Sequence, residues 1–185
     1  MKVRQLRIEG LRLIEPDIHV DHRGHFLEIF QEARYRSEGV PSEFVQENLS
    51  WSKKGVLRGL HFQHPNAQAK LVSVLAGRAF DVVVDVRRGS PTFGHWHGEV
   101  LDDLKRKQLY IPTGLAHGFM ALSDSVLFGY KCSAFYEPSS ERGIRWDDPD
   151  IGIVWPDGKK IVSERDENFP SLADEGLVLP PYEAP

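Results

Sequence analysis

The sequence predicts an all-β protein of the jelly-roll class, built as a sandwich or barrel of short strands with a few short helices. Many short segments alternate apolar and polar residues with the period of two that is typical of strands. The 185 residues include 16 Gly and 12 Pro, which suits strands joined by turns better than a bundle of helices. The length suits one domain over residues 1–185, with an irregular, proline-rich tail at about residues 177–185.

Seven segments are predicted as strands, at residues 56–63, 71–75, 79–86, 96–101, 108–111, 118–122 and 126–133. Residues 79–86 (AFDVVVDV) place Asp81 and Asp85 on one face and four apolar residues on the other. The Ala-Gly-Arg sequence at residues 76–78 predicts a hairpin between two of these strands. In the last strand, Tyr130 and Cys132 share a face with apolar neighbours.

Helical signals are few and short. Residues 30–37 (FQEARYRS) predict one helix, because Gly39 and Pro41 follow as stop signals. Residues 163–166 begin with Ser163, a residue type that favours the start of a helix, and they predict a single turn. The helices are therefore expected to be accessories to a β-sheet core.

Composition excludes several classes of protein. The chain carries 23 Lys and Arg against 27 Asp and Glu, a formal net charge of −4, which argues against a general nucleic-acid coat and a membrane-surface protein. A small anionic ligand remains compatible with this balance, since a pocket needs only a few cations. The single cysteine, Cys132, cannot form an intramolecular disulfide, and no apolar run approaches the ~20 residues of a membrane span. We expect a cytoplasmic protein.

The densest group of reactive side chains lies at residues 56–70 (VLRGLHFQHPNAQAK) and includes Arg58, His61, His64 and Lys70. Arg58 and His61 are three residues apart, so a regular strand would send them to opposite faces. A bulge at Gly59, or an end of the strand there, would relieve this. The alternative interpretation is a surface strand with scattered polar groups.

Other candidates stand near predicted strand ends. His117 follows a turn at the start of an apolar strand, where it either serves a site or simply caps the strand. Tyr130 is either a core tyrosine with one hydrogen bond or a phenol that donates a proton inside a cavity. Tyr136 keeps the face of Tyr130 if that strand continues regularly. Asp166 is either solvated or a carboxylate that orients a histidine.

A further polar group, Asp21 to Glu28 (DHRGHFLE), offers Arg23 and Glu28 for binding a ligand, although a solvated turn explains it equally well. Among the eight histidines, His95 and His97 form a workable pair of metal ligands on one strand face. No Glu or Cys follows at a spacing that completes a set of about three ligands. We therefore expect neither a metal nor another cofactor, and Cys132 is expected to be a buried bystander.

Long stretches of the chain, taken in order, resemble one family, the dTDP-4-dehydrorhamnose 3,5-epimerases, which are cupin-type jelly rolls. The resemblance covers about residues 16–170. The matching stretches are DHRGHFLEIF, FVQENLSWSKKGVLRGLHFQ, QAKLVSVLAGRAFDVVVDVRRGSPTFG, IPTGLAHGFMAL, YKCSAFYEPSSERGIRWDDPDIGIVWP and SERDENFP. A match of this length and order is far more specific than any short motif.

The resemblance implies roles for individual residues. His61 matches the general base, Asp166 the carboxylate that pairs with it, and Tyr130 the general acid. Tyr136 matches an aromatic residue that stacks near the thymine ring, and Arg165 stands where the family often has lysine. Positions that match substrate contacts are Arg23, Glu28, Gln46, Glu47, Asn48, Arg58, Lys70, His117 and Glu141.

The implied substrate is a dTDP-4-keto-6-deoxy sugar, and the implied enzyme is a metal-independent homodimer whose N-terminal residues reach the partner's site. Protons at C3 and C5 are both acidic, since each carbon adjoins the C4 ketone, and Lys70 is the expected stabiliser of the enolate. Three alternatives remain at this level: an epimerase that acts only at C3 or C5, a metal-dependent cupin enzyme, and a jelly roll that binds sugar nucleotides without catalysis.

Overall fold

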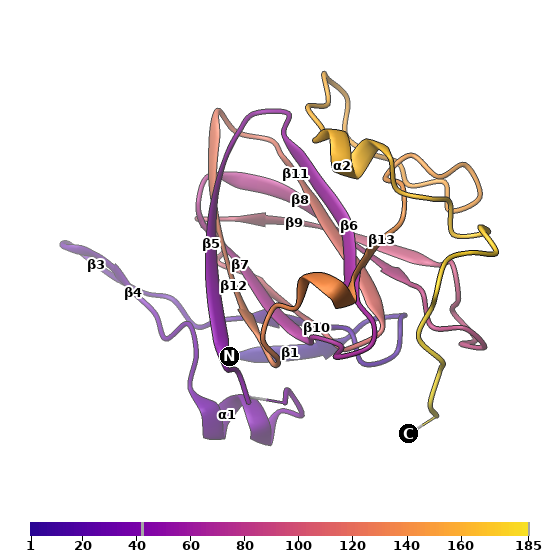
Figure 1. The fold of residues 1–185 in the computed structure, drawn as a ribbon. Coiled ribbons are helices and arrows are strands. Elements are labelled where there is room, and N and C mark those ends of the chain that lie inside the picture. Colours follow the sequence, from indigo (N-terminus) through magenta and orange to yellow (C-terminus); the bar gives the residue numbers. More distant parts are fainter. Residues whose placement is uncertain (42, 185) are drawn as a thin grey trace.

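The computed structural model describes residues 1–41 and 43–184, and two antiparallel β-sheets that face each other make up most of it (Figure 1). The larger sheet has six strands in the order β1-β2-β10-β7-β12-β5. Their bounds are β1 Lys2–Gln5, β2 Arg12–Glu15, β10 Gln108–Ile111, β7 Lys70–Ala76, β12 Ser125–Cys132 and β5 Gln46–Lys53.

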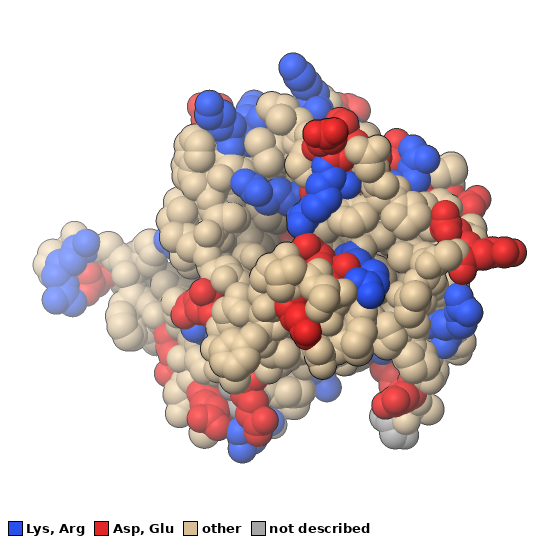
Figure 2. All heavy atoms as spheres, in the orientation of Figure 1, with Lys and Arg blue, Asp and Glu red and all other residues tan. Residues whose placement is uncertain are grey.

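The second sheet has five strands in the order β13-β6-β11-β8-β9. Their bounds are β13 Glu141–Gly143, β6 Leu57–Gln63, β11 Leu115–Ala121, β8 Arg78–Asp85 and β9 Trp96–Asp102. A separate hairpin of β3 (His19–Asp21) and β4 (Gly24–Phe26) projects from the body as an arm (Figures 1 and 2). Every strand pair in the described residues is antiparallel, apart from isolated single bridges.

Three short helical segments complete the secondary structure of the described residues: α1 (Glu32–Ser37), the 3₁₀ turn η1 (Pro138–Ser140) and α2 (Glu164–Glu167). The predicted helix is confirmed, although it starts two residues later, because the Gln31 side chain caps it by accepting the Arg34 N–H at 2.6 Å. The predicted turn at Ser163 is also confirmed, since its Oγ accepts the Asp166 N–H at 3.2 Å.

The main core lies between the two sheets and contains buried residues of both, such as Val72 and Phe128 from one sheet and Val83 and Phe119 from the other. The rings of Phe119 and Phe128 stack at 4.1 Å between centroids. The outer face of the five-stranded sheet is also covered: Val82 belongs to a second cluster there that includes segments near the C-terminus. Burial on both faces explains why β8 is so rich in valine.

The predicted all-β jelly roll with a few short helices is confirmed, as two separate sheets rather than a closed barrel. All seven predicted strands form, with boundaries shifted by one to three residues at most. The hairpin predicted at residues 76–78 is wrong, because β7 and β8 belong to different sheets. Gly77 (φ +85°) turns the chain from one sheet to the other beside the Ser125 carbonyl. The predicted turn therefore forms, but the two strands that it joins pair with other strands and not with each other.

The sequence did not predict β1 to β5 or β13. Strand β5 is the informative case, because alternate residues Gln46, Asn48, Ser50 and Ser52 are the more buried ones and are all polar. A strand that turns a polar face inward lacks the apolar alternation on which the prediction relied. Among the described residues, no helix is long and apolar enough to cross a membrane.

Candidate active site

A cavity of about 840 Å³ opens between the two sheets, beside β5 and β6 and below the segment that carries α2. Figure 2 shows it as a hollow with both basic and acidic side chains at its rim. One wall comes from β6 and β11, the opposite wall from β5, β7 and β12, and Asp166 and Arg165 lie at the edge. Polar groups from six separated segments of sequence therefore meet in one place.

A bulge in β6 brings Arg58 and His61 to the same cavity. Across the pair of strands, His61 is opposite His117 and Arg58 is opposite Phe119, so three steps on β6 match two on β11. Gly59 occupies the bulge at φ +130°, and a Cβ there would lie 2.5 Å from the Gly118 Cα. The predicted bulge is confirmed, and only glycine fits it.

His61 and Asp166 form a hydrogen-bonded pair, with 2.8 Å between His61 Nε2 and Asp166 Oδ1. The other carboxylate oxygen accepts the Gly59 N–H at 3.1 Å, so β6 contacts both oxygens of the Asp166 carboxylate. Burial by itself would raise the pKa of Asp166, but the hydrogen bonds from His61 and Gly59 outweigh burial and lower it. Asp166 is thus a carboxylate that keeps the Nε2 proton of His61 in place and leaves Nδ1 as the basic nitrogen.

A second histidine–aspartate pair lies on the same wall, with 2.8 Å between His117 Nε2 and Asp81 Oδ2. Asp81 is fully buried, and its Oδ1 has no hydrogen-bond partner among the described residues. Burial raises the pKa of Asp81 despite the opposing effect of His117. Asp81 had no predicted role, because its only signal was an acidic side chain on one face of a valine-rich strand, which it shares with Asp85.

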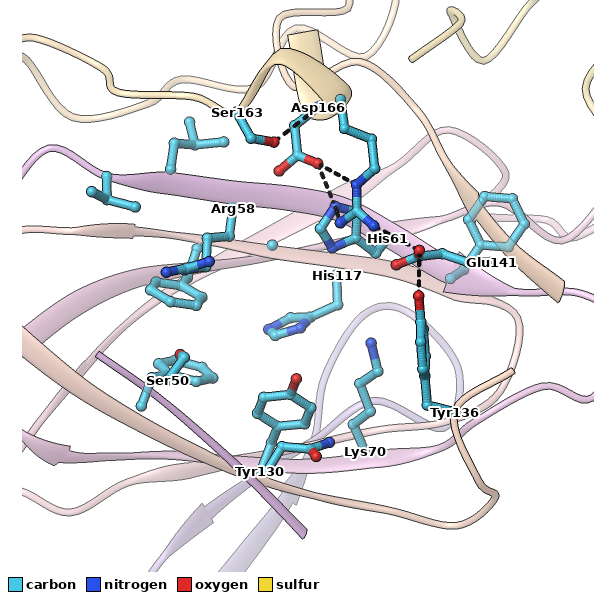
Figure 3. A pocket seen from close by; sticks show the side chains of 18 of the residues that line it. Ser50, Arg58, His61, Lys70, His117, Tyr130, Tyr136, Glu141, Ser163 and Asp166 are labelled. Atoms are coloured by element: carbon cyan, nitrogen blue, oxygen red, sulfur yellow. Dashed lines mark hydrogen bonds and ion pairs between the residues drawn. The ribbon is translucent and has the colours of Figure 1, made fainter. Parts of the chain in front are cut away.

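Tyr130 and Lys70 project from the opposite sheet, across the cavity from His61 and His117 (Figure 3). The Lys70 Nζ lies 6.0 Å from the centroid of the Tyr130 ring. Burial lowers the pKa of Lys70 and raises the pKa of Tyr130. Tyr130 is therefore a protonated phenol near neutral pH, able to donate a proton into the cavity.

Tyr136, Glu141 and Arg165 form a linked group at the edge of the cavity, and Figure 3 shows Tyr136 beside Glu141. The Tyr136 hydroxyl donates to Glu141 Oε2 at 2.8 Å, and Arg165 Nη1 donates to the same oxygen at 2.7 Å. The Tyr136 N–H donates to Gln46 Oε1 at 2.8 Å. Strand β12 ends at Cys132, so a loop and not a continued strand places Tyr136 here.

Strand β5 contributes Gln46, Asn48 and Ser50 to the cavity. Glu47 points to the other side of the strand, where it pairs with Lys131 at 2.8 Å. Ser50 was not predicted, yet its buried Oγ has no hydrogen-bond partner among the described residues. Strand alternation would have found it, two residues beyond Asn48, had β5 been recognised as a strand.

Arg23 and Glu28 do not line the cavity of this chain. Arg23 lies on the arm, where it pairs with Asp21 at 2.6 Å and its side chain is 78% exposed. Glu28 pairs with Arg34 at 3.1 Å. These two predicted contacts are thus apart from the other predicted site residues.

The residues in the described part of the chain include no group of three or more His, Cys, Asp or Glu arranged to hold a metal ion. Cys132 is buried and free, as predicted, and burial raises the pKa of its thiol. What the cavity does assemble is two histidine–aspartate pairs, a buried phenol and a buried amine. Such a set is suited to moving protons.

Comparisons with known proteins agree with this geometry. A family model described as dTDP-4-dehydrorhamnose 3,5-epimerase matches residues 5–174. The dTDP-4-dehydrorhamnose 3,5-epimerase of Methanothermobacter thermautotrophicus is 47% identical, covering 93% of this chain and 95% of that protein. The dTDP-4-dehydrorhamnose 3-epimerase of Streptomyces niveus is 44% identical, covering 98% of this chain and 90% of that protein.

Among solved structures, the dTDP-6-deoxy-D-glucose-3,5-epimerase of Legionella pneumophila, in complex with dTDP-4-keto-L-rhamnose, is 48% identical. It superposes with a TM-score of 0.94 and covers 99% of both chains. A 3'-monoepimerase of Streptomyces bikiniensis in complex with dTDP-quinovose is 42% identical, with a TM-score of 0.87 over 91% of this chain and 86% of that one.

Proposed function

The chain belongs to the dTDP-4-dehydrorhamnose 3,5-epimerase family, and from this premise we propose that it converts dTDP-4-dehydro-6-deoxy-D-glucose into dTDP-4-dehydro-L-rhamnose in dTDP-L-rhamnose biosynthesis. The observation that carries the proposal is the placement of the His61–Asp166 pair on one wall of the cavity and Tyr130 on the other (Figure 3). A base and an acid on opposite sides of one carbon are what inversion requires.

His61 removes the proton from the carbon next to the ketone. Asp166 accepts a hydrogen bond from the Nε2–H of His61, so Nδ1 has the free electron pair. The carboxylate also stabilises the imidazolium that forms, since opposite charges attract strongly at this distance in a partly buried site. The product of this step is an enolate with its negative charge on the C4 oxygen.

Lys70 stabilises the enolate oxygen, and Tyr130 returns a proton from the opposite face. A fixed cation in a dry site favours the charge that develops in the transition state. Tyr130 retains its proton until then, because burial raises its pKa. One cycle inverts C3 and another inverts C5, and each cycle exchanges one carbon-bound proton with solvent.

Other polar and aromatic groups of the cavity hold the nucleotide. Arg58 suits the diphosphate, because a guanidinium meets two oxyanion oxygens at once. Its Nε donates to Ser52 Oγ at 3.1 Å, which orients the planar group. Tyr136 offers a ring for the thymine base, with Gln46 bonded to its backbone.

A second copy of the chain would bring Arg23 and Glu28 into use, so we also propose a homodimer. The arm that carries Arg23 exposes Val20 and Phe26 by 77% and 71%, a large apolar exposure for so short a hairpin. Leu49 and Trp51 on the edge strand β5 are likewise 61% and 56% exposed. An arm that crosses to a partner would cover apolar surface and place Arg23 near the partner's cavity.

The proposal is tested by NMR of the product formed from dTDP-4-keto-6-deoxyglucose in heavy water. We expect deuterium at both C3 and C5 with the wild type and at neither with His61→Ala. Tyr130→Phe is expected to permit exchange but to slow inversion. Complete exchange by folded His61→Ala would eliminate His61 as the base, and normal inversion by Tyr130→Phe would eliminate Tyr130 as the acid.

Exchange, chelation and binding measurements distinguish the alternatives. Exchange at one carbon would make this chain a mono-epimerase like its Streptomyces relatives. Turnover that is lost with a chelator and restored by a divalent metal would favour a metal-dependent enzyme. Binding of the nucleotide sugar without any exchange would indicate a non-catalytic jelly roll.

A further inference from the structure

The Arg165 guanidinium lies at the edge of the cavity, within contact of Glu141 and of the His61–Asp166 pair. Its Nη1 donates to Glu141 Oε2 at 2.7 Å, and its Nε lies 3.4 Å from Asp166 Oδ1. Its Nη2 lies 3.4 Å from His61 Nε2. One planar group therefore reaches three residues of the site at once.

Glu141 extends this connection to the aromatic ring. The oxygen that accepts from Arg165 also accepts from the Tyr136 hydroxyl at 2.8 Å. Tyr136 is 48% exposed, so its ring has few packing neighbours to fix its angle. The hydrogen bond to Glu141 is then the main restraint on the free end of the ring, and Arg165 is what holds Glu141.

We propose that Arg165 is a positioning residue that ties the Tyr136 ring to the His61–Asp166 pair. The inference rests on the proposed function, since it takes His61 as the base and Tyr136 as the partner of the thymine ring. It assigns Arg165 a role inside the protein in addition to any contact with substrate.

The contacts of Arg165 show how one side chain links the two groups. Glu141 from β13 holds one end of the guanidinium, and Asp166 lies at the other, where its Oδ1 is also 2.8 Å from His61 Nε2. The Phe169 ring packs edge-on against His61 at 5.6 Å.

The shape of arginine matters as well as its charge. A guanidinium carries five N–H groups in a fixed plane, whereas a lysine ammonium is one point of charge on a flexible stem. Arg165→Lys therefore retains the charge and loses the fork, while Arg165→Gln removes both. The two variants separate the electrostatic role from the geometric one.

The two variants are compared with a matched control. Arg145→Gln removes an exposed arginine that pairs with Asp147 outside the cavity, so it shows whether the loss of any surface arginine has the same effect.

The measurement is the affinity for dTDP, which contains the thymine ring but no sugar to epimerise. We expect both Arg165 variants to bind it about tenfold more weakly, the equivalent of losing one hydrogen bond to a charged group, and the control to bind it as the wild type does. Equal affinity in wild type and both variants would overturn the tie to Tyr136. A wild type that shows no proton exchange would instead defeat the proposed function, and the dTDP affinities would still report on Arg165.

Discussion

Asp166→Asn isolates the electrostatic part of the His61–Asp166 pair. Asparagine has nearly the same volume and keeps one oxygen to accept from His61 Nε2, 2.8 Å away in the wild type. The variant thus removes a charge and leaves the shape. Asp166 is buried, with only 4% of its side chain exposed, and His61 has 21% exposed, so bulk water screens the pair little.

The size of the effect follows from that distance. With the centres of the two charges about 4 Å apart and an effective dielectric constant of about 20, the imidazolium gains about 4 kcal/mol from the carboxylate. At 1.36 kcal/mol for each factor of ten, losing this stabilisation slows proton abstraction by roughly 10²- to 10³-fold. Changes of this size are within the range that general base catalysis supplies.

The assay is the rate of deuterium incorporation at C3 and C5 of the keto sugar, measured by NMR in heavy water. Glu167→Gln is the matched control, because it removes an exposed carboxylate from the same short helix. We expect the control to exchange at the wild-type rate. If folded Asp166→Asn exchanges within threefold of the wild type, the carboxylate does not assist His61 and the argument from charge is refuted.

Further predictions concern other parts of the cavity. Lys70→Met should slow exchange by about 100-fold or more with dTDP affinity retained, and near-normal exchange would contradict its role on the enolate. Tyr136→Ala should weaken dTDP binding by about 1–3 kcal/mol in calorimetry and Tyr136→Phe by less, because only alanine removes the ring. Gly118→Ala should lower the free energy of urea unfolding by about 2 kcal/mol, since its Cβ would lie 2.5 Å from the Arg58 carbonyl oxygen; unchanged stability would contradict this. The folded-state pKa of Asp166 is lowered, so its stabilisation is present above pH ~4 and is lost as pH falls further. The stability difference between wild type and Asp166→Asn should shrink on acidification, and a constant difference would contradict this linkage.

Much of the fold could be predicted, because its core strands have local patterns. Strand β8 shows this well: Asp81 and Asp85 share one face of the strand, and Phe80, Val82 and Val84 lie on the other. Strand β5 could not be predicted in the same way, since its inward residues are polar and only the cavity explains them. The turn at Gly77 was recognised, yet the sheet to which each flanking strand belongs depends on distant partners.

The same distinction between local patterns and distant partners applies to the site. The residue types around His61 indicated proton chemistry, and the glycine beside them indicated the bulge that Arg58 and His61 need. Asp81 was missed because an aspartate in a buried strand has no local feature that reveals its partner, His117, 36 positions away. Glu47 was selected with its neighbours, but strand alternation turns it away from the cavity.

By itself, the sequence determined seven of the strands, the glycine that permits the bulge and the kinds of groups available, because these depend on spacing over a few residues. The order of matching stretches also determined the family. Only the tertiary structure decided which groups meet: it put Asp166 against His61 from 105 positions away, and it kept Arg23 out of the cavity of its own chain. Hydrogen bonds and charges act over a few ångströms in space, and that proximity is set by how the two sheets pack, which no local pattern records.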